Sequence, residues 1–334
     1  MEWSRRVRIV VLALVAGVPA SGCALRIPFT PFYTPATLEA DRVEVRLDVP
    51  YRTDAGADPE KHRLDLFLPR RPGWPLLAFV HGGSLEKGDS ALRLGGHDIY
   101  RNIGRFYASR GVGVALINYR LQPDVLWPAQ VDDVAAAAGW LIPRLKKLGG
   151  DGTFFLSGHS AGSWLVSQVA LDPEVQRRYR FDVDDIEGVI SVSGSGFDLT
   201  DDLTWEMFGR EEIWRRRFSV AENDPDWKRN ASLIPLLRSD APPFLLLFSS
   251  HEWRALRRQN RLMCDAAETL HVGCELVEVG GEGHIRMVLA MSDPRRDVAP
   301  RILTALGVDP AAVERERRPD QSTTRNPDVA VSSR

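Results

Sequence analysis

The stretch FFLSGHSAGSWL, residues 154–165, joins an apolar run to a turn of small residues and then to the start of a helix. Its centre, GHSAG (158–162), has the pattern G-x-S-x-G. A serine at a sharp strand-to-helix turn needs small residues two places before and after it, because neighbouring segments pass close by. The turn exposes the hydroxyl, and the N-terminal N–H groups of the helix face the same place. The stretch predicts Ser160 as a nucleophile; the alternative is a small residue in a tight turn.

A serine hydroxyl is a weak nucleophile unless a base takes its proton and an acid orients that base. For this motif the expected chain order is serine, acid, histidine. His284, in GGEGHIRM directly after the last predicted strand, is the predicted base. Glu252 lies just beyond the strand in PPFLLLFSSHEW and is the predicted acid, because α/β sites form at the carboxyl ends of strands. Asp198 and Asp265 are the alternative acids.

A second glycine motif, His81-Gly82-Gly83, follows the apolar run PLLAFV (75–80). Such a motif predicts backbone donors that act with the N–H of the residue after the nucleophile to form an oxyanion hole. We therefore expect Gly82, Gly83 and Ala161 to supply these donors, and His81 to order the loop. A phosphate-binding turn is the alternative, but neither G-K-[ST] nor G-x-G-x-x-G follows.

Apolar runs alternate with helical patterns from residue 75 onward. This alternation predicts an α/β fold with a mostly parallel central sheet and helices on both faces. Two earlier segments, 42–49 and 62–69, alternate with period two and predict an antiparallel edge. The other expected strands lie at 75–80, 111–119, 152–158, 186–194, 243–250 and 274–281, with a helix over 131–149.

The segment 197–241 is polar and rich in tryptophan, and we expect it to form a small cap over the site. Loops this long in compact domains usually have a function or are disordered, so a surface connection is the alternative. Trp164, Trp205 and Trp214 are candidates to line a substrate pocket. An ordinary position in the hydrophobic core explains each of them about equally well, because tryptophan is usually well buried.

The first 22 residues have the features of a signal peptide. Arginines precede an apolar run, Ile9–Val18, that is too short to span a bilayer comfortably. The sequence ASGC that follows resembles a bacterial lipobox, which predicts that Cys23 is lipidated and that residues 23–40 form a tether. The expected location is the bacterial cell envelope, with membrane contact through the lipid. A plain secreted protein is the alternative.

The expected hydrolase domain spans residues 41–307, and the polar tail 308–334 is expected to be disordered because it has few apolar residues to bury. Cys264 and Cys274 are capable of pairing in an oxidising compartment. We favour two separate buried small hydrophobes, since the sequence does not fix the Cα separation that a bridge needs.

Composition excludes several classes of function. The formal net charge is −2, which gives no basis for a nucleic-acid partner. The three cysteines and seven histidines show no zinc-type spacing. We therefore expect no metal and no cofactor. The sequence does not indicate the oligomeric state.

Together, these motifs resemble the α/β-hydrolase family. The matching stretches lie between about residues 42 and 307 and include HRLDLFLP, FVHGGSLEKGD, LSGHSAGSWL, PPFLLLFSSHEW and GEGHIRMVLAMSDP. They are similar to bacterial carboxylesterases related to hormone-sensitive lipase, to feruloyl-esterase-like enzymes and to kynurenine formamidases. His159 is closer to the feruloyl-esterase and formamidase branch. Ser84, Leu85 and the glutamate of FSSHE depart from the usual pattern.

The resemblance implies a serine carboxylesterase with a Ser160–His284–Glu252 triad, acting on short-chain or aromatic esters of small molecules. An arylformamidase or amidase with the same triad is the alternative, since only the shape of the pocket separates them. A non-catalytic binding module with this fold is a third reading, and the intact serine, histidine and oxyanion motifs argue against it.

Overall fold

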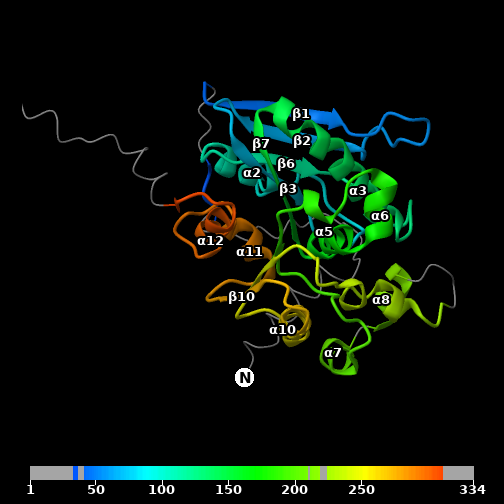
Figure 1. Cartoon of the computed structure of the whole chain (residues 1–334). Helices are drawn as coiled ribbons and strands as arrows, with labels where there is room; N and C mark the ends of the chain where they lie inside the picture. The colour runs from blue at the N-terminus through cyan, green and yellow to red at the C-terminus, as the bar shows by residue number, and fades with distance from the viewer. Residues whose placement is uncertain (1–32, 37–40, 210, 219–223, 311–334) are drawn as a thin grey trace, which may run out of the picture.

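The computed structural model describes residues 33–36, 41–209, 211–218 and 224–310. These residues form an eight-stranded sheet in the order β1-β2-β6-β3-β7-β8-β9-β10 and a small pair, β4-β5 (Figure 1). The strands are β1 (Val43–Pro50), β2 (Arg63–Pro69), β3 (Trp74–Val80), β4 (Arg93–Leu94), β5 (His97–Asp98), β6 (Gly113–Ile117), β7 (Gly150–His159), β8 (Gly188–Val192), β9 (Phe244–Ser249) and β10 (Cys274–Val279).

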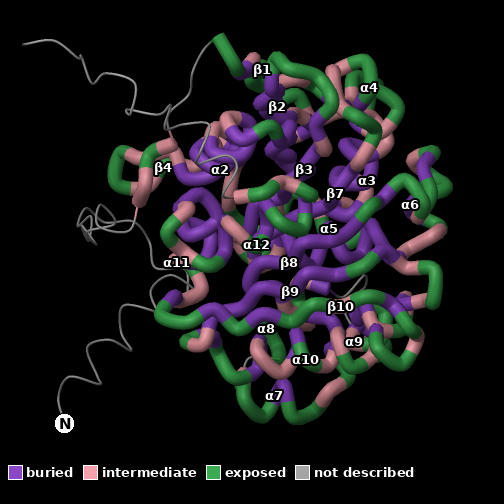
Figure 2. The backbone as a smooth tube through the Cα atoms, turned by 60° about the vertical axis from the view of Figure 1, so that its left-hand side comes forward, coloured by how far each residue is buried: buried purple, intermediate pink, exposed green. Residues whose placement is uncertain are grey.

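The strands from β6 through β10 in this order run parallel, and β2 is antiparallel to both β1 and β6. The predicted parallel sheet and its antiparallel edge are confirmed. The central strands are continuous apolar runs that are buried along their length (Figure 2), as expected for strands covered on both faces. This is the α/β-hydrolase fold.

Helices cover both faces of the sheet. One apolar cluster packs α2 (Tyr100–Ala108), α11 (His284–Ala290) and α12 (Val298–Ala305) on one face. The other packs α3 (Ala129–Leu141), α5 (Ala161–Leu171), α6 (Pro173–Tyr179) and α10 (Arg254–Thr269) on the opposite face. Figure 1 shows α2, α11 and α12 on one side of the strands, and α3, α5 and α6 on the other.

The helix expected over 131–149 is interrupted. α3 ends at Leu141, a 3₁₀ turn covers Ile142–Arg144, and the short α4 (Leu145–Leu148) follows. Pro143 explains the break, because proline has no N–H to donate and its ring disfavours a continuous α-helix.

The described part of segment 197–241 contains three α-helices, α7 (Asp202–Phe208), α8 (Glu211–Phe218) and α9 (Trp227–Ala231), and a 3₁₀ turn at Ile234–Leu236. Figure 1 shows α7 and α8 together at the end of the molecule away from β1. Arg258 of α10 binds Asp201 with two hydrogen bonds of 2.6 and 2.7 Å. Arg217 of α8 pairs with Glu86, in the loop after β3, at 3.1 Å. The described part of this segment, which we call the cap, is therefore held to two different parts of the body.

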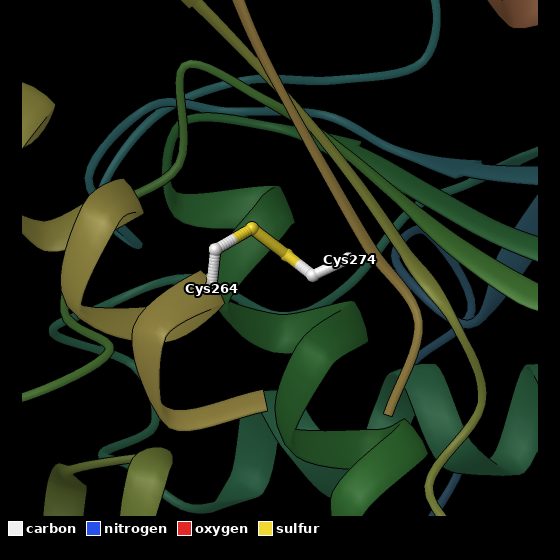
Figure 3. Close-up of a disulfide and its surroundings, with 2 residues drawn as sticks. All are labelled: Cys264 and Cys274. Atoms are coloured by element: carbon white, nitrogen blue, oxygen red, sulfur yellow. A yellow bond between two sulfur atoms is a disulfide. The ribbon is translucent and has the colours of Figure 1, made fainter. Parts of the chain in front are cut away.

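Cys264 and Cys274 form a disulfide between α10 and β10 (Figure 3). The expectation of two separate buried cysteines is therefore wrong. The chain leaves α10 and turns directly back into β10, which brings the two Cα atoms to 5.4 Å, within the range that a bridge requires.

Near the N-terminus, the described residues 33–36 lie on the body. Asn102 of α2 bonds to this segment twice, at the carbonyl oxygen of Thr34 and at the N–H of Ala36. Thr34 Oγ1 also donates to Asp293, at 3.0 Å. Cys23, the signal peptide and residues 311–334 of the tail lie outside the described residues. No helix in the described part of the chain is long and apolar enough to cross a membrane.

Candidate active site

Ser160 lies at the turn between β7 and α5, with φ 55° and ψ −120°. This left-handed φ is unfavourable for a residue with a side chain. The two motif glycines make the turn possible. A Cβ on Gly158 would lie 2.3 Å from the carbonyl carbon of Gly162, and a Cβ on Gly162 would lie 2.2 Å from the carbonyl oxygen of Val80. The strand-to-helix turn predicted from the sequence is therefore present, and close packing explains both glycines.

The structure brings Ser160, His284 and Glu252 into one chain of hydrogen bonds. Ser160 Oγ lies 2.9 Å from His284 Nε2. His284 Nδ1 lies 3.0 and 3.1 Å from the two carboxylate oxygens of Glu252. Because a carboxylate only accepts, we assign the imidazole proton to Nδ1, which leaves the Nε2 lone pair to accept the serine hydroxyl. The three residues follow β7, β10 and β9, so they meet at the carboxyl edge of the parallel sheet.

Glu252 is almost fully buried, whereas the His284 side chain is 18% exposed. Burial raises the pKa of Glu252, but the hydrogen bond and charge of His284, together with the Ser193 hydroxyl, outweigh it. The pKa of Glu252 is therefore below its usual value. The carboxylate is therefore ionised at neutral pH.

The expected oxyanion donors lie beside the serine. A Cβ on Gly82 would be 3.1 Å from Ser160 Cβ, which places the His81–Gly83 loop against the hydroxyl. Among the described residues, no hydrogen-bond acceptor is found for the N–H groups of Gly83 or Ala161. The Gly82 backbone faces the buried Tyr100, where it opposes the burial that raises the pKa of the phenol to about 12. Gly83 and Ala161 are therefore the two expected donors whose N–H groups have no acceptor among the described residues.

Two further histidines are buried near the site. Burial and the nearby His284 lower the pKa of His159 to about 3, and its Nε2 lies 2.9 Å from the His284 carbonyl oxygen. Burial lowers the pKa of His81 to about 4, and its ring stacks on Tyr119 at 4.4 Å. Both rings are neutral at physiological pH. His81 supports the loop, as expected, and His159 contacts the backbone of the base.

The tryptophans predicted to line a pocket occupy different environments. Trp164 and Trp205 are buried, and their indole N–H groups donate to the carbonyl oxygens of Ala231 and Leu199. Trp214 is only partly buried. Beneath the cap, Trp205 and Trp214 border a cavity of about 10 Å³, which has room for about one water molecule.

Sequence reasoning missed Trp253, which is 41% exposed and directly follows Glu252. Its ring stacks on the His284 imidazole, with centroids 5.6 Å apart and planes inclined by 24°. The available signal was an aromatic residue next to the predicted acid, at the end of a strand where α/β sites are built.

The alternative acids do not contact His284. The Asp198 carboxylate accepts hydrogen bonds from Thr200, and Asp265 lies on the surface of α10. Asp265 borders a cleft of about 350 Å³ that contains no member of the hydrogen-bonded chain. Three arginines of this cleft form ion pairs with Asp201 or Glu278. Among the described residues, no group of three His, Cys, Asp or Glu side chains is placed to hold a metal ion.

Comparison with known proteins identifies the family. The BD-FAE family model matches residues 64–252, more than half of the chain. The chain belongs to the BD-FAE family. The matched range begins in β2 and ends at Glu252; it includes the His81 loop and Ser160, and His284 follows it.

Several curated relatives of this BD-FAE protein are named as esterases. It is 29% identical to esterase LipC of Mycobacterium tuberculosis over 65% of this chain and 54% of the relative. It is 24% identical to the isoprenylcysteine alpha-carbonyl methylesterase ICME of Arabidopsis thaliana over 72% of this chain and 57% of that protein. The chain spans about half the length of the curated relatives it matches.

Solved structures confirm the fold. Esterase B of Lactobacillus rhamnosis superposes with a TM-score of 0.65 at 22% identity, covering 86% of this chain and 91% of the other. A hyperthermophilic esterase from Pyrobaculum calidifontis gives 0.62 at 22% identity, covering 81% of this chain and 86% of the other.

Proposed function

We propose that this protein is a serine carboxylesterase that hydrolyses esters of small carboxylic acids. The observation that supports this most directly is the continuous hydrogen-bonded chain from Ser160 Oγ through His284 to Glu252. A nucleophile within 2.9 Å of a base, and that base within 3.1 Å of an orienting acid, are the arrangement that acyl transfer needs. The esterase names of the relatives support the same reaction class.

In the proposed mechanism, His284 Nε2 accepts the Ser160 proton as Oγ attacks the ester carbonyl carbon. The imidazolium that forms is stabilised by the ionised Glu252 carboxylate. Negative charge develops on the former carbonyl oxygen, where the N–H groups of Gly83 and Ala161 donate hydrogen bonds. Donors fixed in place before the reaction stabilise this charge without reorganising, which is usually a large part of catalysis.

The imidazolium then protonates the leaving alcohol, and an acyl group remains on Ser160. Water, deprotonated by His284, attacks this acyl-enzyme and releases the carboxylic acid. The proton returned to Ser160 completes the cycle. Each step uses only groups of the chain and water.

The deciding experiment is hydrolysis of p-nitrophenyl acetate, butyrate, octanoate and palmitate, with Ser160→Ala beside the wild type. We expect kcat for the best ester to fall by about 10⁶-fold in the variant. Ser109→Ala, a serine at the end of α2, is the matched control and should leave the rate unchanged. A folded wild type that hydrolyses none of these esters would overturn the proposal. Turnover of formanilide in its place would identify an arylformamidase with the same triad.

We also propose that the protein is exported and anchored through a lipid on Cys23. The n-region, short apolar run and ASGC sequence support this, and the Cys264–Cys274 disulfide suits an oxidising compartment. Expression in a bacterium with radiolabelled palmitate tests it. The label should be found in the wild-type chain and be absent from Cys23→Ala. An unlabelled wild type that remains in the cytosolic fraction would contradict the proposal.

A further inference from the structure

Exposed apolar side chains lie on helices of the cap and on residues next to Glu252 and His284. Leu203 and Met207 lie on α7, Ile213 on α8, Trp253 just before α10, and Ile285 next to His284; each is at least 36% exposed. Trp253 is the one aromatic residue of this set, and its ring stacks directly on the imidazole of the proposed base.

Phe208, at the end of α7, completes an aromatic surface with Trp253. The two rings meet edge to face with centroids 6.0 Å apart. Phe208 also meets Trp214 edge to face at 5.6 Å, and Trp214 stacks on Phe218 at 5.6 Å. Trp214 and Phe218 are packed into the cap. They hold Phe208 and Trp253 in place, while the Trp253 ring stays accessible. A rigid, exposed ring is suited to bind a flat apolar group at low entropic cost.

The proposed mechanism indicates which half of the substrate this surface faces. The leaving alcohol oxygen must receive its proton from His284 Nε2, which lies 2.9 Å from Ser160 Oγ. The alcohol part of a bound ester therefore lies beside the imidazole. Trp253 covers one side of that imidazole, whereas the glycine donors lie on the carbonyl side, next to Ser160.

We propose that Trp253 and Phe208 form a subsite for the alcohol part of the ester, and that this subsite selects aromatic alcohols over aliphatic alcohols of the same size. The inference rests on the proposed esterase function and specifies its substrate class. Stacking on Trp253 is expected to favour an aryl group by about tenfold in kcat/KM.

Benzyl acetate and cyclohexylmethyl acetate test this subsite, since they share the acyl group and have leaving groups of similar size. In the wild type, kcat/KM should favour the benzyl ester by about tenfold. Trp253→Leu should bring the ratio close to one, and Trp253→Phe should restore most of it. The matched control is Trp140→Leu, which removes a tryptophan of α3 whose ring is covered by the Arg144 guanidinium. It should retain the wild-type ratio.

The subsite would be overturned if Trp253→Leu kept the wild-type ratio of kcat/KM, either with both values unchanged or with both lowered equally. An equal loss would make Trp253 a positioning residue for His284. Benzyl alcohol binding to Ser160→Ala, measured by calorimetry, separates this result from failure of the esterase proposal. We expect binding to weaken about tenfold when Trp253→Leu is added. This readout needs no turnover, so it holds even for a wild type that is inactive on esters.

Discussion

His159 Nε2 lies 2.9 Å from the main-chain carbonyl oxygen of His284, so the residue before the proposed nucleophile also holds the backbone of the proposed base. A carbonyl only accepts, and His159 therefore donates from Nε2 as a neutral ring. The contact joins β7 to the first residue of α11, two segments 125 residues apart. It therefore ties the backbone of His284 to the residue next to Ser160.

His159→Phe tests this contact, because phenylalanine fills similar space without a donor. We expect kcat to fall by about tenfold with little change in KM, since His284 is held less firmly for proton transfer. The pKa of His159 is about 3, so the ring does not titrate between pH 5 and 9 and the shape of the kcat–pH profile should stay the same. A profile that shifts, with kcat intact, would contradict a purely positioning role.

Glu252 is tested by two substitutions that differ in charge and reach. Glu252→Gln keeps the size but removes the charge that stabilises the imidazolium, and we expect kcat to fall by about 10⁴-fold. Glu252→Asp keeps the charge on a shorter side chain and should lose less. Steady-state kinetics on p-nitrophenyl butyrate measures both. Equal activity of Glu252→Gln and the wild type would remove Glu252 from the proposed triad.

The motif glycines should be required for stability as well as for activity. A Cβ at Gly162 would lie 2.2 Å from the Val80 carbonyl oxygen, and the backbone there has little room to move. We expect Gly162→Ala to lower the free energy of unfolding by about 1–3 kcal/mol in urea titrations. Gly280→Ala is the matched control, because a Cβ there meets no atom within 4 Å. Equal stability of the two variants would contradict the steric explanation.

These glycines show why the centre of the site was predictable. Ser160 sits in a turn whose constraints are local, and its two glycines lie within two residues of it. His284 and Glu252 each follow a strand, so the alternation of strands and helices was enough to place them at one edge. Predictions of this kind depend on chain order and on local sterics.

Features that depend on distances between elements were not predictable in this way. The pairing of Cys264 with Cys274 depends on how α10 packs beside β10, which spacing alone does not give. The accessibility of Trp253 depends on where α7 ends relative to the base. Trp164 and Trp205 have the same residue type as Trp253, but the core buries them. Residue type therefore identified candidates for the pocket without ranking them.

Loss of the disulfide should affect stability more than catalysis. The bridge closes a loop with a sequence separation of 10 between α10 and β10. We expect the Cys264→Ala/Cys274→Ala variant to lose about 2–3 kcal/mol of unfolding free energy. Reduction of the wild type should lower the unfolding midpoint similarly, and kcat at 25 °C should be nearly unchanged in both. A reduced wild type with an unaltered midpoint would contradict this prediction.

The Asp201–Arg258 pair should make attachment of the cap sensitive to acid. The Arg258 guanidinium and the Thr204 hydroxyl lower the pKa of Asp201 to about 2. Its stabilising contribution is therefore complete above about pH 4, the unfolded value, and is lost as the pH falls toward 2. We expect Asp201→Asn to cost about 1 kcal/mol at pH 7 and progressively less below pH 4. Urea titrations at pH 7 and pH 3 measure the difference, and a gap that widens in acid would contradict it.

The docked segment at residues 33–36 limits how far the body can lie from a bilayer. Only nine residues lie between Cys23 and Tyr33, and a fully extended chain over these ten residue steps reaches about 35 Å. A lipid on Cys23 would therefore hold the body close to the bilayer through a short tether that is bound to the body at Thr34 and Ala36. An anchored enzyme would then reach esters held in that bilayer by lateral diffusion, and surface density would set the encounter rate for such esters.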